Sequence, residues 1–429
     1  MKIYLKALGC RLNEAELEQW SHQFSLGGHQ IINDGREADI VIVNSCAVTK
    51  EATRKSRKLM NRLHRENPVS KLVVTGCYAT LEEEEVANRL GVDLVVNNSD
   101  KECLPQRVMD EFSSNTMPLI AMEPGETNLF QRGKQRAFIK IQDGCRYRCT
   151  YCIVTIARGE ERSRPPQEII EEVNRLHAQG IQEIVLTGVH VGGYGSDNKT
   201  SLFELVMLLL KETDIARIRF ASVEPWDLPE KFFTLFENQR LMPHMHLPLQ
   251  SGADSVLRRM SRRCKVSDFS DLVTHARRSI NGFNVTTDII VGFPGETDKE
   301  WQQTLESVAT IGFGHVHIFS YSSREGTKAA SLPNQIAAEI KKQRSDEMHQ
   351  LAAKMKSDFS CEQLGKQVSV LWESQQVDDL GRIRYSGYTP NFVRVETILT
   401  DDVILEGKVT NTKLLEYSAD KGVIKGKLQ

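Results

Sequence analysis

The sequence has no apolar run long enough to cross a membrane, since LFELVMLLL is far shorter than the roughly 20 residues that a spanning helix needs. Its net charge is only −2 at pH 7, so the molecule as a whole is not a basic nucleic-acid binder. The N-terminus lacks the charged, apolar and small-residue regions of a signal peptide, and no segment is of low complexity. Nine cysteines in 429 residues are too few for a disulfide scaffold. We therefore expect a cytoplasmic protein whose clustered cysteines bind metal or take part in catalysis.

Three cysteines are close together in IQDGCRYRCTYCIV, namely Cys145, Cys149 and Cys152, here called the central triad. Protein-bound four-iron clusters usually take four cysteine thiolates, so three leave one iron open to a small molecule. The spacing resembles the signature of the radical S-adenosylmethionine (SAM) enzymes, in which the open iron binds SAM and one electron cleaves it to a 5′-deoxyadenosyl radical. A structural zinc site is the alternative, but it needs a fourth protein ligand, and neither His177 nor His190 lies at a usual zinc-ribbon distance.

A second set of three cysteines, the N-terminal triad, consists of Cys10, Cys46 and Cys77. Each follows a short aliphatic run that is typical of a buried parallel strand, and each precedes a helical stretch. Ligands of open α/β sheets gather outside the carboxyl ends of the strands, so we expect the three thiols to converge and to hold a second cluster. The alternative is three ordinary buried cysteines. The remaining Cys103, Cys264 and Cys361 are scattered, and the sequence indicates no role for them.

The chain is expected to be α/β, with an open α/β domain at residues 1–112, a linker at 113–136 and a partial parallel (β/α)6 barrel from 137. The barrel region ends with one long helix at 334–362, and residues 365–429 read as a small all-β module. The expected barrel strands are AFIKIQDG, EIVLTGV, RIRFASV, HMHLPLQ, NVTTDIIVG and HVHIFSY. The expected helices between them are PQEIIEEVNRLHAQ, SLFELVMLLLKE, DLPEKFFTLFE, SDFSDLVTHARRSI and DKEWQQTLESVATI.

Over essentially its whole length the chain resembles the radical SAM methylthiotransferases. The motifs ALGCRLNEAE, NSCAVT and VVTGCYA are similar to the amino-terminal cluster motifs of that family, and DGCRYRCTYCIVTIARG, EIVLTGVHVGGYG, SVEPWDL and HMHLPLQSGADSVLRRMSRR are similar to its radical SAM core. The tail resembles the TRAM β-barrel, a small RNA-binding module. GCRLN with CAVT resembles the MtaB-type branch, which modifies N6-threonylcarbamoyladenosine at position 37 of tRNA. Ser45 stands where threonine is more common in the branch.

The resemblance implies two [4Fe-4S] clusters, SAM, and an electron donor of the flavodoxin or ferredoxin type. It implies that one SAM methylates a sulfur at the cluster of the N-terminal triad. A second SAM, cleaved at the central triad, would activate C2 of the adenine, so that CH3–S replaces its hydrogen. Because cofactors carry such chemistry, we expect no catalytic acid or base from the protein. Methylthiolation of isopentenyladenosine-37 tRNA, methylthiolation of a ribosomal protein, and a non-catalytic iron–sulfur or RNA-binding role remain alternatives, and the oligomeric state is unknown.

The expected SAM contacts follow from position in the motifs. Tyr151 resembles the aromatic residue beside the SAM adenine, and Gly188 permits close backbone approach to the SAM ammonium group. Glu224 and Gln250 are expected at the ribose hydroxyls, and Arg262 at the SAM carboxylate. Ordinary barrel packing for Tyr151 and a solvated surface position for Arg262 are the alternatives.

Residues outside the cluster motifs supply further expectations. Arginine and aromatic side chains of the tail are suited to single-stranded RNA; they are Arg382, Arg384, Tyr385, Tyr388 and Arg394. The basic segments 53–65 and 258–265 could attract phosphates, although solvated helix faces are the favoured interpretation. The strand histidines are expected to be packed or hydrogen-bonded; they are His190, His244, His246, His315 and His317.

Overall fold

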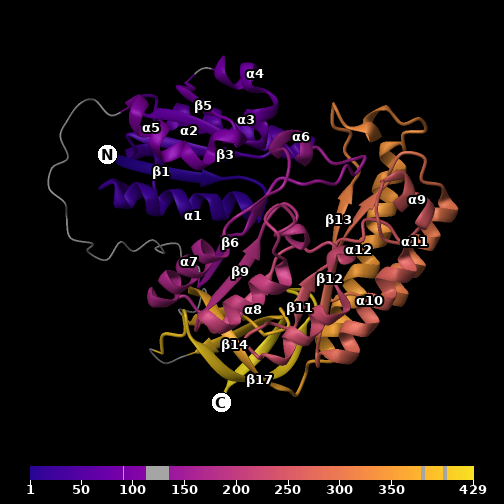
Figure 1. The fold of residues 1–429 in the computed structure, drawn as a ribbon. Helices are drawn as coiled ribbons and strands as arrows, with labels where there is room; N and C mark the ends of the chain where they lie inside the picture. Colours follow the sequence, from indigo (N-terminus) through magenta and orange to yellow (C-terminus); the bar gives the residue numbers. More distant parts are fainter. Residues whose placement is uncertain (90, 113–134, 378–381, 400–402) are drawn as a thin grey trace. The chain divides into compact units, whose positions relative to one another are not determined.

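The structure is a computed structural model that describes residues 1–89, 91–112, 135–377, 382–399 and 403–429 (Figure 1). Nearly all of the expected linker at 113–136 therefore lies outside the described residues. The chain divides into two compact units. The first comprises Met1–Gln131, Asp143–Arg162 and Ser322–Ala330, and the second comprises Arg132–Gln142, Ser163–Tyr321 and Ser331–Gln429. In the part of the chain described, no helix is both long and apolar enough to cross a membrane.

The first unit is built on a five-stranded parallel sheet with the strand order β2-β1-β3-β4-β5. Its strands are β1 (Lys2–Ala7), β2 (Gln30–Ile32), β3 (Ile40–Ser45), β4 (Lys71–Gly76) and β5 (Leu94–Val96). Strands β1, β3 and β4 are the three runs expected before the N-terminal triad. β3 is buried along its whole length, as expected for a central parallel strand covered on both faces.

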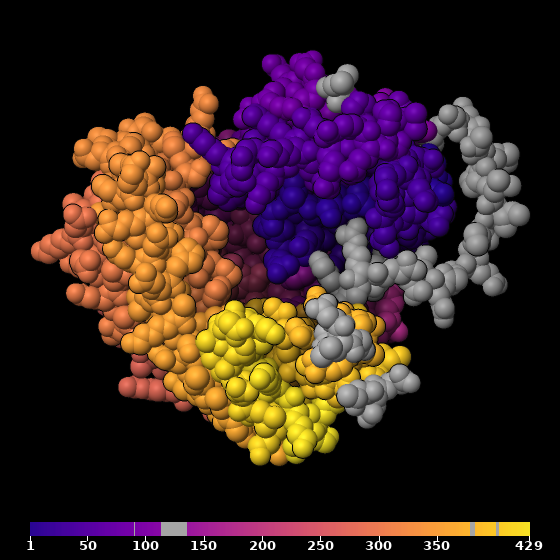
Figure 2. Space-filling model, turned by 180° about the vertical axis from the view of Figure 1, so that it is seen from behind, coloured from indigo at the N-terminus to yellow at the C-terminus, as the bar shows by residue number. Residues whose placement is uncertain are grey.

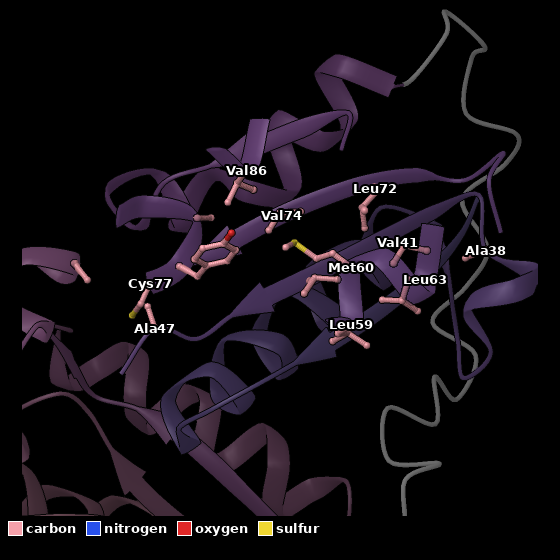
Figure 3. Packing of buried hydrophobic residues seen from close by; sticks show 14 residues of the cluster. Ala38, Val41, Ala47, Leu59, Met60, Leu63, Leu72, Val74, Cys77 and Val86 are labelled. Carbon is pink, nitrogen blue, oxygen red and sulfur yellow. The ribbon is translucent and has the colours of Figure 1, made fainter. Parts of the chain in front are cut away.

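Helices cover both faces of this sheet. They are α1 (Arg11–Leu26), α2 (Lys50–Glu66), α3 (Cys77–Leu81), α4 (Glu83–Ala87), α5 (Leu104–Phe112) and, from the segment after residue 143, α6 (Val154–Arg158). On one face, α1 and α5 pack through residues such as Trp20 and Val108. On the other face, α2 packs Leu59, Met60 and Leu63 against the sheet, and Figure 3 shows this core, with Cys77 and Ala47 next to each other at one end of it.

Short elements complete the first unit and its borders. Two 3₁₀ helices lie within the unit, η1 (Gly35–Glu37) and η2 (Asn98–Cys103). Three elements lie where the chain passes from one unit to the other: β7 (Gln142–Asp143), β8 (Arg162–Ser163) and η6 (Lys328–Ser331).

The second unit contains six parallel strands in the order in which they follow one another along the chain. They are β6 (Arg136–Lys140), β9 (Glu183–Thr187), β10 (Arg217–Phe220), β11 (His244–His246), β12 (Asn284–Val291) and β13 (His315–Ser320). Hydrogen-bonded ladders join the first three and the last three, and parallel bridges such as Ser222–His246 link the two halves. The partial (β/α)6 barrel predicted from the alternating pattern is confirmed, and all six expected strands are present.

Most of the helices that alternate with these strands also match expectation. The helices that match are α7 (Pro166–Ala178), α8 (Leu202–Glu212), α10 (Val266–Ser279), α11 (Asp298–Ile311) and α12 (Ala338–Cys361). The structure adds the short helix α9 (Asp254–Arg259) and the 3₁₀ helices η3 (Val191–Gly193) and η4 (Pro225–Asp227), which were not expected. The α-helix expected at 227–237 is wrong, because the segment forms the 3₁₀ helix η5 (Glu230–Glu237). In a 3₁₀ helix, side chains three residues apart are eclipsed. This allows Phe233 and Phe236 to pack together against Phe283.

Residues after α12 form the closed five-stranded barrel expected for the tail, with strand order β14-β15-β16-β18-β17. Its strands are β14 (Gln367–Val377), β15 (Ile383–Tyr388), β16 (Arg394–Leu399), β17 (Val409–Ser418) and β18 (Val423–Leu428). Trp372 and Tyr385 lie in its core, and Phe359 of α12 packs against that core. Figure 2 shows the outer surface of this C-terminal barrel in yellow, beside the orange segment that includes α12.

The loop between β15 and β16 joins the C-terminal barrel to the first half of the partial barrel. Arg219 of β10 donates to the Pro390 carbonyl at 3.0 Å, and its guanidinium lies 4.7 Å from the centre of the Phe392 ring. Arg217 donates to the Ser369 carbonyl at 2.9 Å, and His244 stacks on Phe392 with ring centres 4.8 Å apart. The two arginine hydrogen bonds are part-buried and charge-assisted, and together with the ring contacts they hold the second unit together across its two barrels.

Candidate functional site

The N-terminal triad lies at the carboxyl ends of three neighbouring strands in the first unit. Cys10 follows β1 and precedes α1, Cys46 follows β3, and Cys77 opens α3 directly after β4. In the order β2-β1-β3-β4-β5, the chain leaves β1 toward one side and continues from β3 toward the other. This is the topological switch point, where open α/β sheets bind ligands.

Two glycines bring the strand ends close enough for the thiols to meet. Gly9 has φ +99°, and a Cβ on it would lie 2.6 Å from the Cys46 sulfur. Gly76 also has φ +99°, and a Cβ there would lie 2.2 Å from the Ser45 carbonyl oxygen. Both positions therefore require glycine, for the backbone angle and for the space. The Ser45 hydroxyl donates to the Thr75 carbonyl at 2.5 Å, so this residue ties β3 to β4.

The three thiols influence one another electrostatically. Burial raises the pKa of the Cys46 thiol to about 11, and Cys10 and Cys77 contribute to the rise. Burial also raises the pKa of the Cys10 thiol, although Cys10 is exposed as a residue. Asn98 Nδ2 lies 3.8 Å from the Cys77 sulfur, and the Cys10 sulfur lies 3.7 Å from Asn13 Oδ1. Three adjacent cysteine sulfurs form a donor set suited to an iron–sulfur cluster, which binds cysteines as thiolates.

The central triad lies on a loop of the same unit that leads into α6. All three of its cysteines are half-buried. The Tyr147 backbone N–H donates to the Cys145 sulfur at 3.4 Å, and the Cys152 N–H donates to the Cys149 carbonyl at 3.0 Å. Such N–H groups directed at sulfur are a common means of tuning cluster potentials. The loop is closed at Gly144, where a Cβ would lie 1.8 Å from the Glu160 carbonyl oxygen.

A buried charge network, which the sequence reasoning missed, links the two cysteine sets. Arg158, at the end of α6, donates to Glu16 at 2.9 Å, to Asp143 at 3.0 Å and to Asn13 at 2.8 Å. Lys101 Nζ lies 2.6 Å from the same Glu16. Each of these ionic side chains is less than 5% exposed. One sequence feature could have predicted this network: Glu16 lies four residues after Leu12, and therefore on the apolar face of α1.

The network acts on the thiols as well as on the fold. Arg158 lowers the pKa of Cys10 and of Cys46, and so opposes the effect of burial on both. Asp143, which Arg158 holds, is two residues before Cys145. Arg158 thus stabilises negative charge at the N-terminal triad and anchors the start of the loop that carries the central triad.

The other expected SAM contacts lie in the second unit, while Tyr151 lies half-buried in the first. Gly188 follows β9, and a Cβ there would be 3.0 Å from the Gln142 carbonyl oxygen. Gln250 has φ +79°, and its backbone bonds with β12 at Asp288 and Ile290. Arg262 is placed over the Trp226 ring, 4.3 Å from its centre, and it donates to the Pro248 carbonyl.

One carboxylate oxygen of Glu224 is buried without a hydrogen-bond partner. Its Oε2 is buried without a hydrogen bond and lies 3.8 Å from His190 Nε2, which in turn is 2.6 Å from Asp227 Oδ2. Burial raises the pKa of the Glu224 carboxyl. A buried polar atom without a partner is costly, so a ligand that donates a hydrogen bond here would be favoured. The three side chains also have ligand atoms within 4.8 Å of one another, a spacing that a metal ion could use.

The structure changes the interpretation of the expected RNA contacts. Tyr385 is 1% exposed and donates to the Val403 carbonyl at 3.0 Å inside the C-terminal barrel, so the stacking role expected for it is wrong. Tyr388 is stacked on Phe392 with ring centres 4.7 Å apart. Alternation along β15 turns Tyr385 into the core of the closed barrel, whereas Tyr388 at the end of the strand is half-buried. Arg394 is exposed and pairs with Glu396 at 3.2 Å.

Each basic segment contains cations that pair with acidic neighbours, as the favoured interpretation predicted. In 53–65, Arg54 pairs with Glu51 at 2.7 Å and Arg57 pairs with Glu85 at 2.7 Å. In 258–265, Arg259 pairs with Glu300 at 2.9 Å. The expectation for the histidines is also confirmed where hydrogen bonds exist: His190 contacts Asp227, and His244 and His246 contact Thr286.

Comparison with known families gives two matches. Residues 2–97 match the uncharacterized protein family UPF0004, and residues 139–308 match the radical SAM superfamily. The first match contains the N-terminal triad and the second contains the central triad.

Individual relatives match almost end to end. A threonylcarbamoyladenosine tRNA methylthiotransferase, MtaB, from Thermotoga maritima is 36% identical over 406 residues, which cover 92% of this chain and 91% of the relative. A tRNA-2-methylthio-N(6)-dimethylallyladenosine synthase from Bacillus pumilus is 35% identical over 439 residues, covering 99% of this chain and 82% of the relative. Among solved structures, the radical SAM methyltransferase TsrM from Kitasatospora setae aligns with a TM-score of 0.55 at 13% identity and covers 77% of each chain, which shows the fold alone.

Proposed function

The chain belongs to the radical SAM methylthiotransferase family, and we propose that it replaces the C2 hydrogen of N6-threonylcarbamoyladenosine 37 of tRNA by a CH3–S group. The observation that carries the proposal is the presence of two separate cysteine triads in one compact unit. A radical SAM enzyme needs only one such set for SAM cleavage, so a second set indicates a second task. The relative from Thermotoga maritima, named for the threonylcarbamoyladenosine substrate, supports the choice of nucleoside.

Membership of the family implies SAM and a [4Fe-4S] cluster, and we assign that cluster to Cys145, Cys149 and Cys152. We assign a second [4Fe-4S] cluster to Cys10, Cys46 and Cys77. When bound, these groups supply the radical and the site of sulfur methylation. The protein's part is to hold the thiolates, and the backbone N–H of Tyr147 and the guanidinium of Arg158 contribute to that.

The remaining proposed SAM contacts have distinct roles. Glu224, with a buried and unsatisfied oxygen, would accept a hydrogen bond from a ribose hydroxyl. Gly188 and Gln250 would offer backbone and amide groups, Arg262 would pair with the SAM carboxylate, and Tyr151 would lie beside the adenine. We further propose the domain boundaries 1–112, 137–362 and 365–429, with the last module contributing to RNA binding.

The cluster assignment is tested by iron analysis of anaerobically reconstituted full-length protein. Replacing the whole central triad by alanine should halve the iron and abolish 5′-deoxyadenosine formation from SAM. Replacing the whole N-terminal triad should also halve the iron but leave SAM cleavage measurable. The matched control replaces the three scattered cysteines, Cys103, Cys264 and Cys361, and should keep all of the iron. A wild-type protein with one cluster, or with stoichiometric zinc, contradicts the assignment.

The substrate is tested by competition among tRNAs that carry threonylcarbamoyl, isopentenyl or no group on adenosine 37. A site built to hydrogen-bond the threonyl hydroxyl and carboxylate should reject adenosine that lacks them by roughly 10⁴-fold, because its own polar groups would stay unpaired. The relative from Bacillus pumilus makes the isopentenyl form the second candidate. Preference for that form would assign the protein to the neighbouring branch, and labelling of a ribosomal protein instead would refute a tRNA substrate.

The reaction also requires an electron donor, and we propose one of the flavodoxin or ferredoxin type. Reduction of the purified protein by such a donor, followed by measurement of 5′-deoxyadenosine, checks this. A tRNA substrate and oxygen-sensitive clusters both favour a cytoplasmic location.

A further inference from the structure

The inner face of β13 carries an unusual row of aromatic rings. Because side chains alternate along a strand, His315, His317 and Phe319 point to one side and Val316 to the other. Val316 is 3% exposed, whereas His317 is exposed and Phe319 is 47% exposed. Among the exposed large apolar side chains of the described residues, Phe319 is the one aromatic residue.

The side on which this row lies is the inner side of the partial barrel. His315 and His317 are paired in register with Thr286 and Asp288 of β12, so all four face the same way. His246 of β11 contacts both of the latter: its Nδ1 is 2.9 Å from Thr286 Oγ1, and its Nε2 is 3.2 Å from Asp288 Oδ1. His244, two residues earlier on β11, shares the face of His246 and stacks on Phe392 together with Arg219 from β10.

The imidazole rings form an ordered surface. The rings of His315 and His317 are perpendicular, with centres 4.6 Å apart, and the ring of His246 is 5.4 Å from that of His317. Burial, with the nearby His317 and Lys356, lowers the pKa of His315 to about 4. His315 is therefore neutral at physiological pH and presents an aromatic ring rather than a cation.

Core packing does not account for this row. The inner faces of closed (β/α)8 barrels are filled with layers of branched aliphatic side chains. A single exposed apolar residue is ordinary, but here Phe319 continues a line of two histidines along one strand. Strands that present aromatic rings in this way serve in single-stranded RNA recognition, where unpaired bases stack on Phe, Tyr, Trp or His. Basic groups stand close by, with Lys356 and His349 of α12 acting on His315.

Resting on the proposed function, we propose that the inner strip of β13, formed by His315, His317 and Phe319, is a stacking surface for an unpaired base of the RNA substrate. Phe319 supplies the accessible ring, and the two histidines extend the surface along the strand. The strip selects for an extruded base because every base offers an aromatic face to it, while paired bases in a stem do not. The strip therefore does not distinguish one nucleoside from another, and other residues of the protein make that distinction.

The test compares Phe319→Leu, which keeps an apolar side chain but removes the ring, with Phe319→Tyr, which keeps the ring. Binding of threonylcarbamoylated tRNA to the anaerobic holoenzyme is measured at several salt concentrations. Loss of one stacked base should weaken binding by about 5- to 150-fold in Phe319→Leu. Phe319→Tyr should bind as the wild type does. The salt dependence should not change, because no phosphate contact is removed. Met207→Leu, at an apolar position of α8 that is 51% exposed, is the matched control and should have no effect.

A spectroscopic measurement reports stacking directly. An anticodon stem-loop with 2-aminopurine in the loop should lose fluorescence on binding the wild type and Phe319→Tyr, and should keep it on binding Phe319→Leu. His317→Ala should have an intermediate effect. Formation of 5′-deoxyadenosine without RNA must stay at the wild-type level in every variant, which shows that the SAM site is intact.

The outcomes separate the stacking proposal from the proposed function. If the wild type methylthiolates tRNA and Phe319→Leu binds it equally well, the stacking surface is refuted and the function stands. The same holds if Phe319→Tyr loses as much affinity as Phe319→Leu. If the wild type neither binds nor modifies any tRNA, the proposed function itself fails.

Discussion

Replacing Arg158 by methionine should destabilise the first unit markedly, because Arg158 is 2% exposed and holds two buried carboxylates. Removing one partner of a buried ion pair generally costs about 3–5 kcal/mol, since the other charge is left without compensation. Here Glu16 keeps Lys101 at 2.6 Å, so Asp143 is the carboxylate that loses its main cation. The exposed Arg162, 4.0 Å from Asp143, compensates only weakly. We therefore expect the free energy of unfolding to fall by about 3 kcal/mol, near the lower end of that range.

The assay is urea unfolding of the anaerobic holoenzyme, combined with hydrogen exchange of peptides from α1 and from residues 143–158. Exchange should rise in both segments, because Arg158 joins them through Asn13, Glu16 and Asp143. The matched control is Arg148→Met, on the same loop, where the pair with Glu160 is about 70% exposed on both sides and contributes less than about 1 kcal/mol. The double variant Arg158→Met with Asp143→Asn should recover part of the loss. Equal stability of Arg158→Met and Arg148→Met would refute the reasoning.

Three further predictions concern the second unit. Phe392→Ala should lower the free energy of unfolding by about 2–3 kcal/mol, less than a fully buried phenylalanine, while Leu415→Ala on the barrel surface should have little effect in the same urea titration. Removing residues 365–429 should destabilise the partial barrel as well as weaken tRNA binding, because Arg217 and Arg219 lose their carbonyl acceptors; a truncated protein that unfolds at the wild-type urea concentration contradicts this. Burial would by itself raise the pKa of Glu183, but Arg219 and Arg136 outweigh it and lower the pKa to about 2. The lowered pKa of Glu183 contributes about 3 kcal/mol to the free energy of unfolding. This contribution is present above the unfolded-state pKa of 4.5 and is lost as the pH falls from there toward 2. The difference in urea midpoint between wild type and Glu183→Gln should therefore shrink over that range.

The pattern of aliphatic runs, and the residues that end them, predicted most of the strands of both units. Aliphatic runs that end in glycine or serine before cysteine predicted β1, β3 and β4, and six further runs predicted the strands of the partial barrel. The short strands β2 and β5 went unrecognised, because three residues carry too little pattern to be distinguished from a loop. They matter nonetheless, since β2 beside β1 creates the switch point at which Cys10 and Cys46 lie.

The failures of sequence reasoning share a physical cause. Tyr385 was expected to bind RNA because its residue type suits stacking, but the closure of the C-terminal barrel turns it into the core. The 3₁₀ helix η5 replaced an expected α-helix because its phenylalanines pack against Phe283, which is distant in the chain. In both cases local pattern was outweighed by contacts between residues far apart in sequence.

The sequence by itself determined the order of the elements, the two cysteine triads and the glycines that let the strand ends approach, because each of these depends on neighbouring residues or on fixed spacing. Only the tertiary structure decided that Arg158 joins Glu16 to Asp143, and that His246, Asp288 and His317 share one face with Phe319. Burial, the partners of charged groups and the direction of side chains arise from segments that meet only after the chain has folded, so no local pattern encodes them.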